Sequence, residues 1–272
     1  MSTSTCPQCN GSGFVLIRGE GIKGRCDCWK QERNARLLAS SGIPPRFSKA
    51  KLDNFETMGN PYLELALAVA KHFVQEYPMN PPGEGLLFVG RPGLGKTHLA
   101  IGIIEGLIRT KSVQCLFVDF PTLLKRIQYS YNPSTQISEE SLVTPFREAE
   151  ILVVDDVGSM KPSAWVVDEV RQIVNARYLN NRSTILTTNY ADTVRKGGRG
   201  FDPRVVINEA GDVDQFKYNQ LRNLGVIRDE EETLTDRIGE LNRSRLVQMC
   251  KTIEMSGDDY RRKTAAGRTQ SV

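Results

Sequence analysis

The eight residues 90–97, Gly-Arg-Pro-Gly-Leu-Gly-Lys-Thr, constrain the fold more than any other part of the sequence. They fit the pattern G-x-x-x-x-G-K-[ST] at every fixed position, after an apolar run at 86–89 and before a helical pattern at 96–109. The glycines let backbone N–H groups converge on phosphate oxygens, and the helix N-terminus adds positive partial charge. The segment therefore predicts a phosphate-binding loop in an α/β fold. A chance match in a glycine-rich turn is the alternative, and the strand and helix around the motif disfavour it.

The loop also predicts which residues hold a nucleotide. We expect Lys96 to bridge the outer phosphates of ATP and the Thr97 hydroxyl to ligate Mg²⁺. The predicted nucleotide-binding residues are Gly90, Arg91, Pro92, Gly93, Leu94, Gly95, Lys96, Thr97 and His98.

Two acidic residues, Asp155 and Asp156, follow a second apolar run at 151–154. A buried parallel strand that ends in carboxylates delivers them to the edge of the sheet that carries the phosphate loop. We expect Asp155 to hold Mg²⁺ through water, and Asp156 to orient and polarise the attacking water. Asn189 follows the strand expected at 184–188, where it could bind that water or the terminal phosphate. An ordinary turn residue is an equally open interpretation of Asn189.

The rest of the chain alternates between the two patterns. Apolar runs at 86–89, 115–118 and 151–154 and a further expected strand at 184–188 are separated by helical patterns at 96–109, 120–131 and 164–179. Short strands that are apolar on both faces predict a parallel sheet covered by helices on both faces. Further helices are expected at 61–77 and 234–249, followed by a strand at 252–255. Residues 191–232 lack a clear period and predict a long loop or insertion, and 263–272 a flexible tail.

Four of the six cysteines crowd the start of the chain: Cys6, Cys9, Cys26 and Cys28. Four thiolates match the ligand count of a closed tetrahedral zinc site, although the second pair is C-x-C rather than C-x2-C. Reduced or redox-active cysteines are the alternative. We expect a zinc-binding module with a basic helix over residues 1–42, then an extended linker over 43–60. Cys115 and Cys250 are interpreted as small core residues.

Composition adds broad limits. With 39% apolar and 25% charged residues, the chain is of the ordinary globular kind, which excludes disorder throughout, collagen and a disulfide scaffold. The formal net charge of +4 fits a nucleic-acid surface and a solvated mixed surface about equally. No apolar run is long enough to cross a bilayer, and the first residues lack the features of a secretory signal. A cytoplasmic protein without a membrane partner is therefore expected.

Together these segments resemble the AAA+ helicase-loader family of DnaC and DnaI, with its relative IstB, which assists transposition. The resemblance runs from about residue 6 to residue 261. It rests on Cys-Pro-Gln-Cys-Asn-Gly-Ser-Gly-Phe at 6–14, Ile-Pro-Pro-Arg-Phe at 43–47, and the segments 85–100, 152–158, 187–189, 244–250 and 257–261.

The resemblance implies an AAA+ P-loop NTPase domain over residues 61–262 that hydrolyses ATP. It implies that Asn189 is the sensor-1 residue and that Arg261 lies near the nucleotide. Arg245 is then the arginine finger that reaches the ATP of a neighbouring subunit, so the chain self-associates head to tail into a spiral or ring. The family also presents single-stranded DNA to the inside of that spiral. The residues that match this surface are Tyr129, Tyr131, Ser163 and Trp165, for whose aromatics core packing is the alternative.

The implied function is ATP-dependent loading of a replicative helicase onto DNA, with the helicase contacted through the N-terminal module. A second candidate is an IstB-like, ATP-dependent DNA-binding helper that targets a transposase. The ATPase core does not separate the two, and the cysteine module favours the loader. A small-molecule kinase is disfavoured by the Asp pair, Asn189 and the late Ser-Arg-Leu. Asp156 stands where many members have Glu, and Arg237 and Arg243 are local competitors of Arg245.

Overall fold

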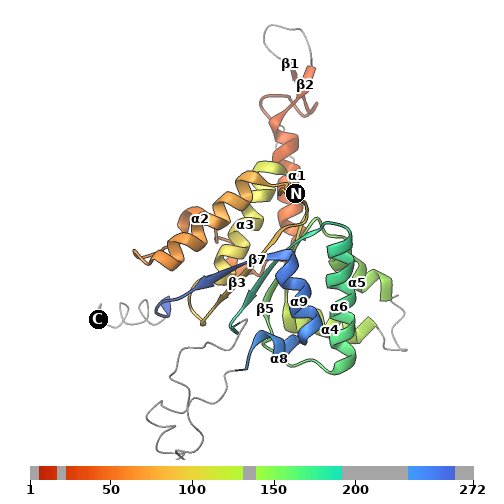
Figure 1. Ribbon diagram of the computed structural model, residues 1–272. Helices are drawn as coiled ribbons and strands as arrows, with labels where there is room; N and C mark the ends of the chain where they lie inside the picture. The colour runs from red at the N-terminus through yellow and green to blue at the C-terminus, as the bar shows by residue number, and fades with distance from the viewer. Residues whose placement is uncertain (1–5, 17–22, 131–138, 192–231, 261–272) are drawn as a thin grey trace, which may run out of the picture.

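The computed structural model describes residues 6–16, 23–130, 139–191 and 232–260, and Figure 1 shows their arrangement. A small antiparallel hairpin comes first, made of β1 (Phe14–Leu16) and β2 (Lys23–Arg25). It leads into α1 (Asp27–Ser40), which carries the hairpin away from the body of the protein. The predicted loop at 191–232 lies almost wholly outside the described residues, and the tail at 263–272 lies outside them altogether.

The body is built on one five-stranded sheet in the order β4-β5-β6-β3-β7. Every neighbouring pair in it is parallel, as the alternating pattern predicted. Strand β3, which leads into the predicted phosphate loop, lies between β6 and β7. The strands are β3 (Gly85–Gly90), β4 (Cys115–Asp119), β5 (Ile151–Val157), β6 (Ser183–Thr188) and β7 (Cys250–Met255).

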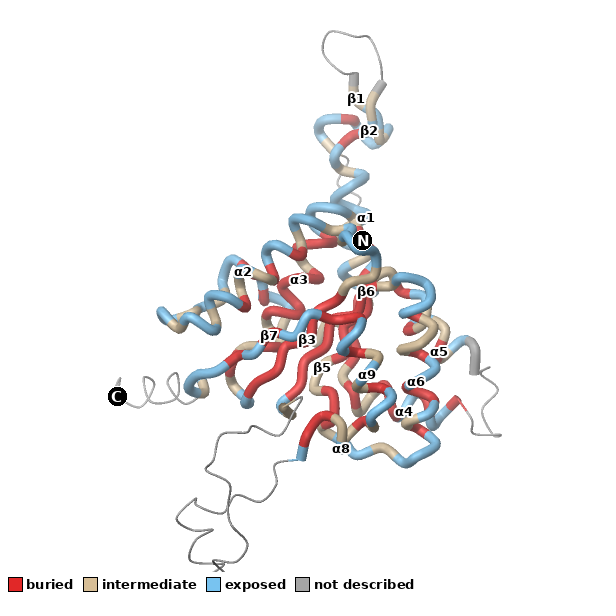
Figure 2. Tube along the Cα trace, in the orientation of Figure 1, coloured by how far each residue is buried: buried red, intermediate tan, exposed pale blue. Residues whose placement is uncertain are grey.

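Helices cover both faces of this sheet, which confirms the predicted fold class (Figures 1 and 2). Successive residues of β3 point to opposite faces: Leu86 and Phe88 join one apolar cluster, whereas Leu87 and Val89 join the other. Such two-sided burial is why these strands are apolar runs rather than alternating patterns. The first cluster is covered by α2 (Pro61–Glu76) and α3 (Lys96–Lys111), and the second by α4 (Phe120–Ser130), α5 (Glu139–Glu148), α6 (Ala164–Leu179) and α9 (Glu240–Met249).

Three segments differ from the sequence-based expectation. The single helix expected at 234–249 is two helices, because Gly239 with φ +84° and ψ +151° separates α8 (Leu234–Ile238) from α9. The helix α5 was not predicted. The segment 43–60 is not extended throughout: it forms 3-10 turns at Pro45–Phe47 and Leu52–Asn54, and Leu52 is buried against α3.

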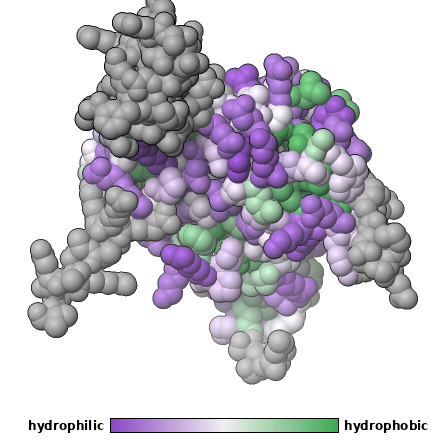
Figure 3. Space-filling view, turned by 90° about the horizontal axis from the view of Figure 1, so that it is seen from below, coloured by the Kyte–Doolittle hydropathy of each residue, from purple (hydrophilic) through white to green (hydrophobic). Residues whose placement is uncertain are grey.

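Within the described residues, no helix combines the length and the apolar character that crossing a bilayer requires. Seen from below in Figure 3, hydrophilic and hydrophobic residues are interspersed over the described part of that face.

Candidate functional site

The loop at 91–95 connects β3 to α3 at the carboxyl edge of the sheet, and its glycines are required by its geometry. Gly93 and Gly95 have φ of +87° and +84°, in the left-handed region that disfavours side chains. A Cβ on Gly90 would lie 2.4 Å from the Met255 carbonyl oxygen, and one on Gly95 would lie 2.5 Å from the Phe55 ring. The backbone can therefore close around an anion only with glycine at these positions.

Lys96 begins α3 and is buried, with its ammonium group turned back into the loop. It donates to the carbonyl oxygens of Gly90 (2.7 Å) and Arg91 (2.9 Å) and to Oδ1 of Asn189 (2.8 Å). The other end of the Asn189 amide, Nδ2, donates to Oδ1 of Asp156 at 2.7 Å. One amide thus links the lysine of the loop to the second acidic residue, and Asn189 is more than a turn residue here.

The first acidic residue faces the loop as well. The Thr97 hydroxyl lies 2.9 and 3.0 Å from the two carboxylate oxygens of Asp155, and the Thr187 hydroxyl donates to Oδ1 at 2.6 Å. Burial raises the pKa of the Asp155 carboxyl, while the hydrogen bonds from Thr187 and Thr97 oppose that rise. A hydroxyl and a carboxylate side by side are the oxygen ligands that Mg²⁺ takes in nucleotide sites, so these residues fit that ion.

These side chains open into a cleft of about 840 Å³. Of the predicted nucleotide-binding residues, 92–98 line it, whereas Gly90 and Arg91 contribute the carbonyl groups that hold Lys96. Arg261 lies outside the described residues.

The segment 43–60 supplies a wall of the cleft that the sequence interpretation missed. Phe47, Phe55 and Asn60 line it, together with Tyr260 from the other end of the chain. His98 fixes this wall, because its Nε2 lies 2.9 Å from both the Lys51 carbonyl oxygen and Asn54 Oδ1. The aromatic residues at 47 and 55 beside a proline-rich turn were the available signal.

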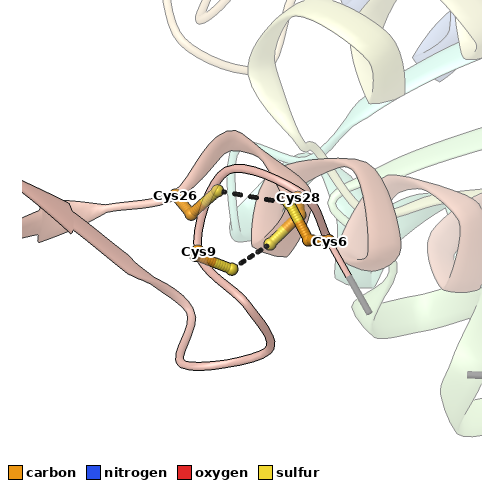
Figure 4. Close-up of side chains that lie close together, drawn as sticks. All are labelled: Cys6, Cys9, Cys26 and Cys28. Carbon is orange, nitrogen blue, oxygen red and sulfur yellow. Dashed lines mark hydrogen bonds between the residues drawn. The ribbon is translucent and has the colours of Figure 1, made fainter. Parts of the chain in front are cut away.

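The four early cysteines form a second candidate site (Figure 4). Their four sulfur atoms all lie within 4.8 Å of one another, with 3.8 Å between Cys6 and Cys26 and 3.6 Å between Cys9 and Cys28. Four sulfurs bound tetrahedrally to Zn²⁺ at 2.3 Å are about 3.8 Å apart. The donor set and its spacing therefore fit zinc.

The pKa values of Cys9 and Cys28 also fit a site for a divalent cation. The Gly13 backbone N–H and further hydrogen bonds lower the pKa of Cys9 to about 7. The neighbouring thiol of Cys26, followed by Cys9, raises the pKa of Cys28 to about 12. Four adjacent thiols cannot all ionise against one another, and a divalent cation removes that repulsion.

Arg245 lies away from the cleft, on α9. Its guanidinium donates to Gln248 Oε1 at 2.9 Å and lies 4.3 Å from the centre of the Tyr178 ring. Its competitor Arg237 is held within the chain: Nε donates to the Gly158 carbonyl oxygen at 2.6 Å, and Nη1 pairs with Glu232 at 2.8 Å. Both arginines therefore have partners within their own chain, with two carbonyl groups and a carboxylate for Arg237 against one amide and one ring for Arg245.

The residues expected to face DNA are at the surface where the structure describes them. Tyr129 is 51% exposed and Trp165 42%, which does not fit the alternative of core packing. Ser163 is exposed and immediately precedes α6. Tyr131 lies outside the described residues.

Known proteins that are similar to this chain include nucleotide-binding proteins, in agreement with the phosphate loop and the cleft. Residues 79–193 match the family described as IstB-like ATP binding protein. The chain is 25% identical over 230 residues to the uncharacterized protein YqaM of Bacillus subtilis, covering 79% of this chain and 67% of YqaM. It is 30% identical over 155 residues to the replicative helicase loader DnaC of Escherichia coli, covering 57% of this chain and 61% of DnaC.

Solved structures agree as well. A crystal structure of the DnaC helicase loader matches with a TM-score of 0.58 and 25% identity, over 78% of this chain and 100% of that one. A crystal structure of DnaI shares the fold, with a TM-score of 0.53 and 21% identity over 83% of this chain and 99% of that one. These matches confirm the resemblance of this chain to the AAA+ family of DnaC, DnaI and IstB-like ATP-binding proteins.

Proposed function

We propose that this chain is an ATPase that loads a replicative helicase onto DNA. The observation that carries the proposal is the polar chain from Lys96 through Asn189 to Asp156, beside the Thr97–Asp155 pair, in a cleft of nucleotide size. The similarity to DnaC supplies the biological context.

The residues divide the chemistry between them. Lys96 exchanges a carbonyl partner for phosphate oxygens, and the loop amides hold the remaining phosphate charge. Mg²⁺ bound beside Thr97 and Asp155 supplies neutralisation of phosphate charge. Asp156 orients the attacking water, and Asn189 holds the Asp156 carboxylate on the side of Lys96.

Two variants test the site. Lys96→Ala should abolish binding of a fluorescent ATP analogue, whereas Asp156→Asn should bind it normally and lose most phosphate release, by about 10²–10⁴-fold. Lys71→Ala, a change to an exposed lysine of α2, is the matched control. Equal affinity for the analogue in the wild type and Lys96→Ala would refute the proposed ATP site.

Self-association completes the proposed site. Arg245 of one copy would reach the nucleotide of the next, which makes the contact head to tail and allows a spiral or ring. Arg245→Ala should then bind ATP normally but hydrolyse it far more slowly, since arginine fingers accelerate phosphoryl transfer by about 10³–10⁵ in GTPases.

Mixing distinguishes this role from a structural one. Lys96→Ala subunits still carry Arg245, so adding them should partly rescue Arg245→Ala. Wild-type turnover should also rise steeply with protein concentration. If Arg243→Ala gives the inactive, binding-competent phenotype instead, the interface stands and the assigned residue is wrong.

The proposed partners are assigned to two separate surfaces, one on the cysteine module and one around Tyr129 and Trp165. The cysteine module would contact the helicase, and Tyr129 and Trp165 would stack on bases of single-stranded DNA, at about 1–3 kcal/mol per stacked base. Alanine substitution of either aromatic should weaken binding of a fluorescent oligonucleotide without changing ATP affinity.

The match to the IstB-like family supports a second candidate function, that of a helper that targets a transposase. Capture with the full chain from its host, identified by mass spectrometry, separates the two. Recovery of a replicative helicase with the wild type but not with Cys26→Ser supports the loader. Recovery of a transposase supports the alternative.

A further inference from the structure

The two acidic residues of the site lie at an irregularity in the sheet. Val154 of β5 pairs with Leu186 of β6, but the next aligned pair is Val157 with Thr188. Asp155 and Asp156 therefore lie opposite the single residue Thr187. Such a bulge interrupts the hydrogen-bond ladder and turns the side chains of the bulged strand to new directions.

The backbone at the bulge takes an unusual conformation. Asp156 has φ +57°, in the left-handed region that a residue with a side chain adopts only when its surroundings hold it there. Its backbone N–H needs a partner in place of the interrupted ladder, because an unpaired buried N–H is costly.

One hydroxyl meets both requirements. The Asp156 N–H donates to Thr187 Oγ1 at 2.9 Å, and the same hydroxyl donates its own proton to Asp155 Oδ1 at 2.6 Å. Thr187 is 1% exposed in the middle of the sheet, so packing fixes the direction of its hydroxyl. The donor and acceptor capacities of this group are both used, one on each acidic residue.

We infer that Thr187 is a positioning residue for hydrolysis, which orients the carboxylate of Asp155 toward Mg²⁺ and fixes the backbone from which Asp156 reaches the attacking water. The inference rests on the proposed ATPase function and assigns it a residue of the cleft whose hydroxyl acts through the two acidic residues.

Neighbouring threonines show why this one is singled out. Thr188 is also buried, but its hydroxyl donates to the Val157 carbonyl oxygen at 2.7 Å and accepts the Tyr190 N–H at 3.1 Å. It holds strand and turn together without contacting either carboxylate. Thr188→Val is therefore the matched control for Thr187→Val, because each change removes one buried hydroxyl from β6 and keeps the shape of the side chain.

The test measures Mg²⁺-dependent binding apart from turnover. A fluorescent ATP analogue is titrated into each full-length variant in excess EDTA and again over a range of Mg²⁺ concentrations, and kcat and KM are measured separately. Thr187→Val should bind in EDTA like the wild type. Its requirement for Mg²⁺ should rise, and its kcat should fall, by about 10–100-fold, the usual cost of losing a group that orients a metal ligand.

Further variants test whether the Thr187 hydroxyl itself is responsible. Thr187→Ser, which keeps the hydroxyl, should restore most of the Mg²⁺ response and of kcat, whereas Thr188→Val should leave both near wild type. A Thr187→Val protein with the Mg²⁺ response and kcat of the Thr188→Val control would overturn the inference. Should Thr187→Val fail to fold, Thr187→Cys replaces it, because it keeps a side chain of similar size with only a weak donor. A Thr187→Cys protein with the Mg²⁺ response and kcat of the Thr188→Val control would then overturn the inference.

The proposed function fails separately. A wild-type chain that neither binds nor hydrolyses ATP would overturn the ATPase assignment, and this inference with it. An active wild type that is indifferent to Thr187 overturns the inference alone.

Discussion

The cysteine module and the sheet domain differ in the side chains that they bury. Among the side chains described at 6–15 and 24–28, the buried ones are Cys9 and Cys26, two of the candidate zinc ligands. The sheet domain has an apolar cluster on each face of its strands. If zinc binds the four thiolates, metal ligation would supply the folding free energy of the module, whereas burial supplies that of a covered sheet. One chain therefore contains two parts that should respond to different perturbations.

The joint between the two parts, α1, is mostly polar. No residue of α1 is buried, and three of its side chains donate to carbonyl oxygens at and just beyond the end of α3: Lys30 to Thr110, Asn34 to Arg109 and Arg33 to Ser112. Such contacts satisfy the last carbonyl groups of a helix. Leu37, further along α1, packs against the first apolar cluster. Because Leu37 lies beyond residues 6–28, we expect the cysteine module to unfold without exposing the core of the sheet.

Removal of zinc should give the largest difference between the two regions. Structural zinc contributes about 10–16 kcal/mol to the folding of small metal-binding units. Chelation or Cys26→Ser should release one zinc per chain and unfold residues 6–28, as measured by elemental analysis and limited proteolysis.

ATP affinity should survive this change, because the cleft lies on the sheet domain. Cys115→Ala is the control, since that buried cysteine lies outside the cluster and its loss should leave the zinc content intact. Metal-replete wild-type protein without stoichiometric zinc would contradict the proposal that zinc stabilises the cysteine module.

Removal of a buried arginine should perturb the other region. Arg177 is 1% exposed and donates to Thr184 Oγ1 and to the carbonyl oxygens of Phe146, Arg147, Ala149 and Ser183. Arg177→Met keeps an unbranched apolar stem but leaves these acceptors unsatisfied, at about 1–3 kcal/mol for each one that water cannot reach.

The expected loss in the free energy of unfolding is at least about 3 kcal/mol by urea titration. Zinc content should not change. Arg171→Met on the exposed side of α6, where the arginine pairs with Asp168 on the surface, should cost less than about 1 kcal/mol. An Arg177→Met protein as stable as Arg171→Met would show that the arginine network adds nothing to the core.

The smallest expected effect sharpens the comparison inside the module. The Ser12 hydroxyl donates to the Cys9 carbonyl oxygen at 2.7 Å and accepts the Phe14 N–H at 3.3 Å. Ser12→Ala should cost about 1 kcal/mol, which is about a fivefold weaker affinity for zinc in competition with a chelator. Ser40→Ala, a serine of α1 that bonds only to the Leu37 carbonyl oxygen, should leave zinc affinity unchanged. A zinc affinity unchanged by Ser12→Ala would mean that the ligands alone determine the fold of the loop.

Most of the sheet and of the loop could be predicted because their signals are local. Buried parallel strands are apolar runs, and the glycines of the loop at 90–95 are required by its own backbone. The strand ends then place Asp155, Asp156 and Asn189 beside Lys96, since parallel strands end at one edge.

The missed parts depend on contacts distant in sequence. Pro145 within α5 conceals a helix that exists because Val143 and Phe146 pack into the core beneath α4. The 3-10 turn at Leu52–Asn54 forms against α3, which no local pattern reveals. Thr187 looked like any strand residue, because its role depends on a bulge in the neighbouring strand.

The position of β7 beside β3 has a consequence for synthesis of the chain. The ribosome releases β3 and the phosphate loop early, whereas β7, the outer neighbour of β3, and the cleft residues Gly257 and Tyr260 come about 160 residues later, roughly 10–30 s at ordinary translation rates. During that interval β3 has an unpaired edge, which is open to wrong partners. The nascent chain therefore carries the complete phosphate-loop motif before the cleft around that loop can be completed.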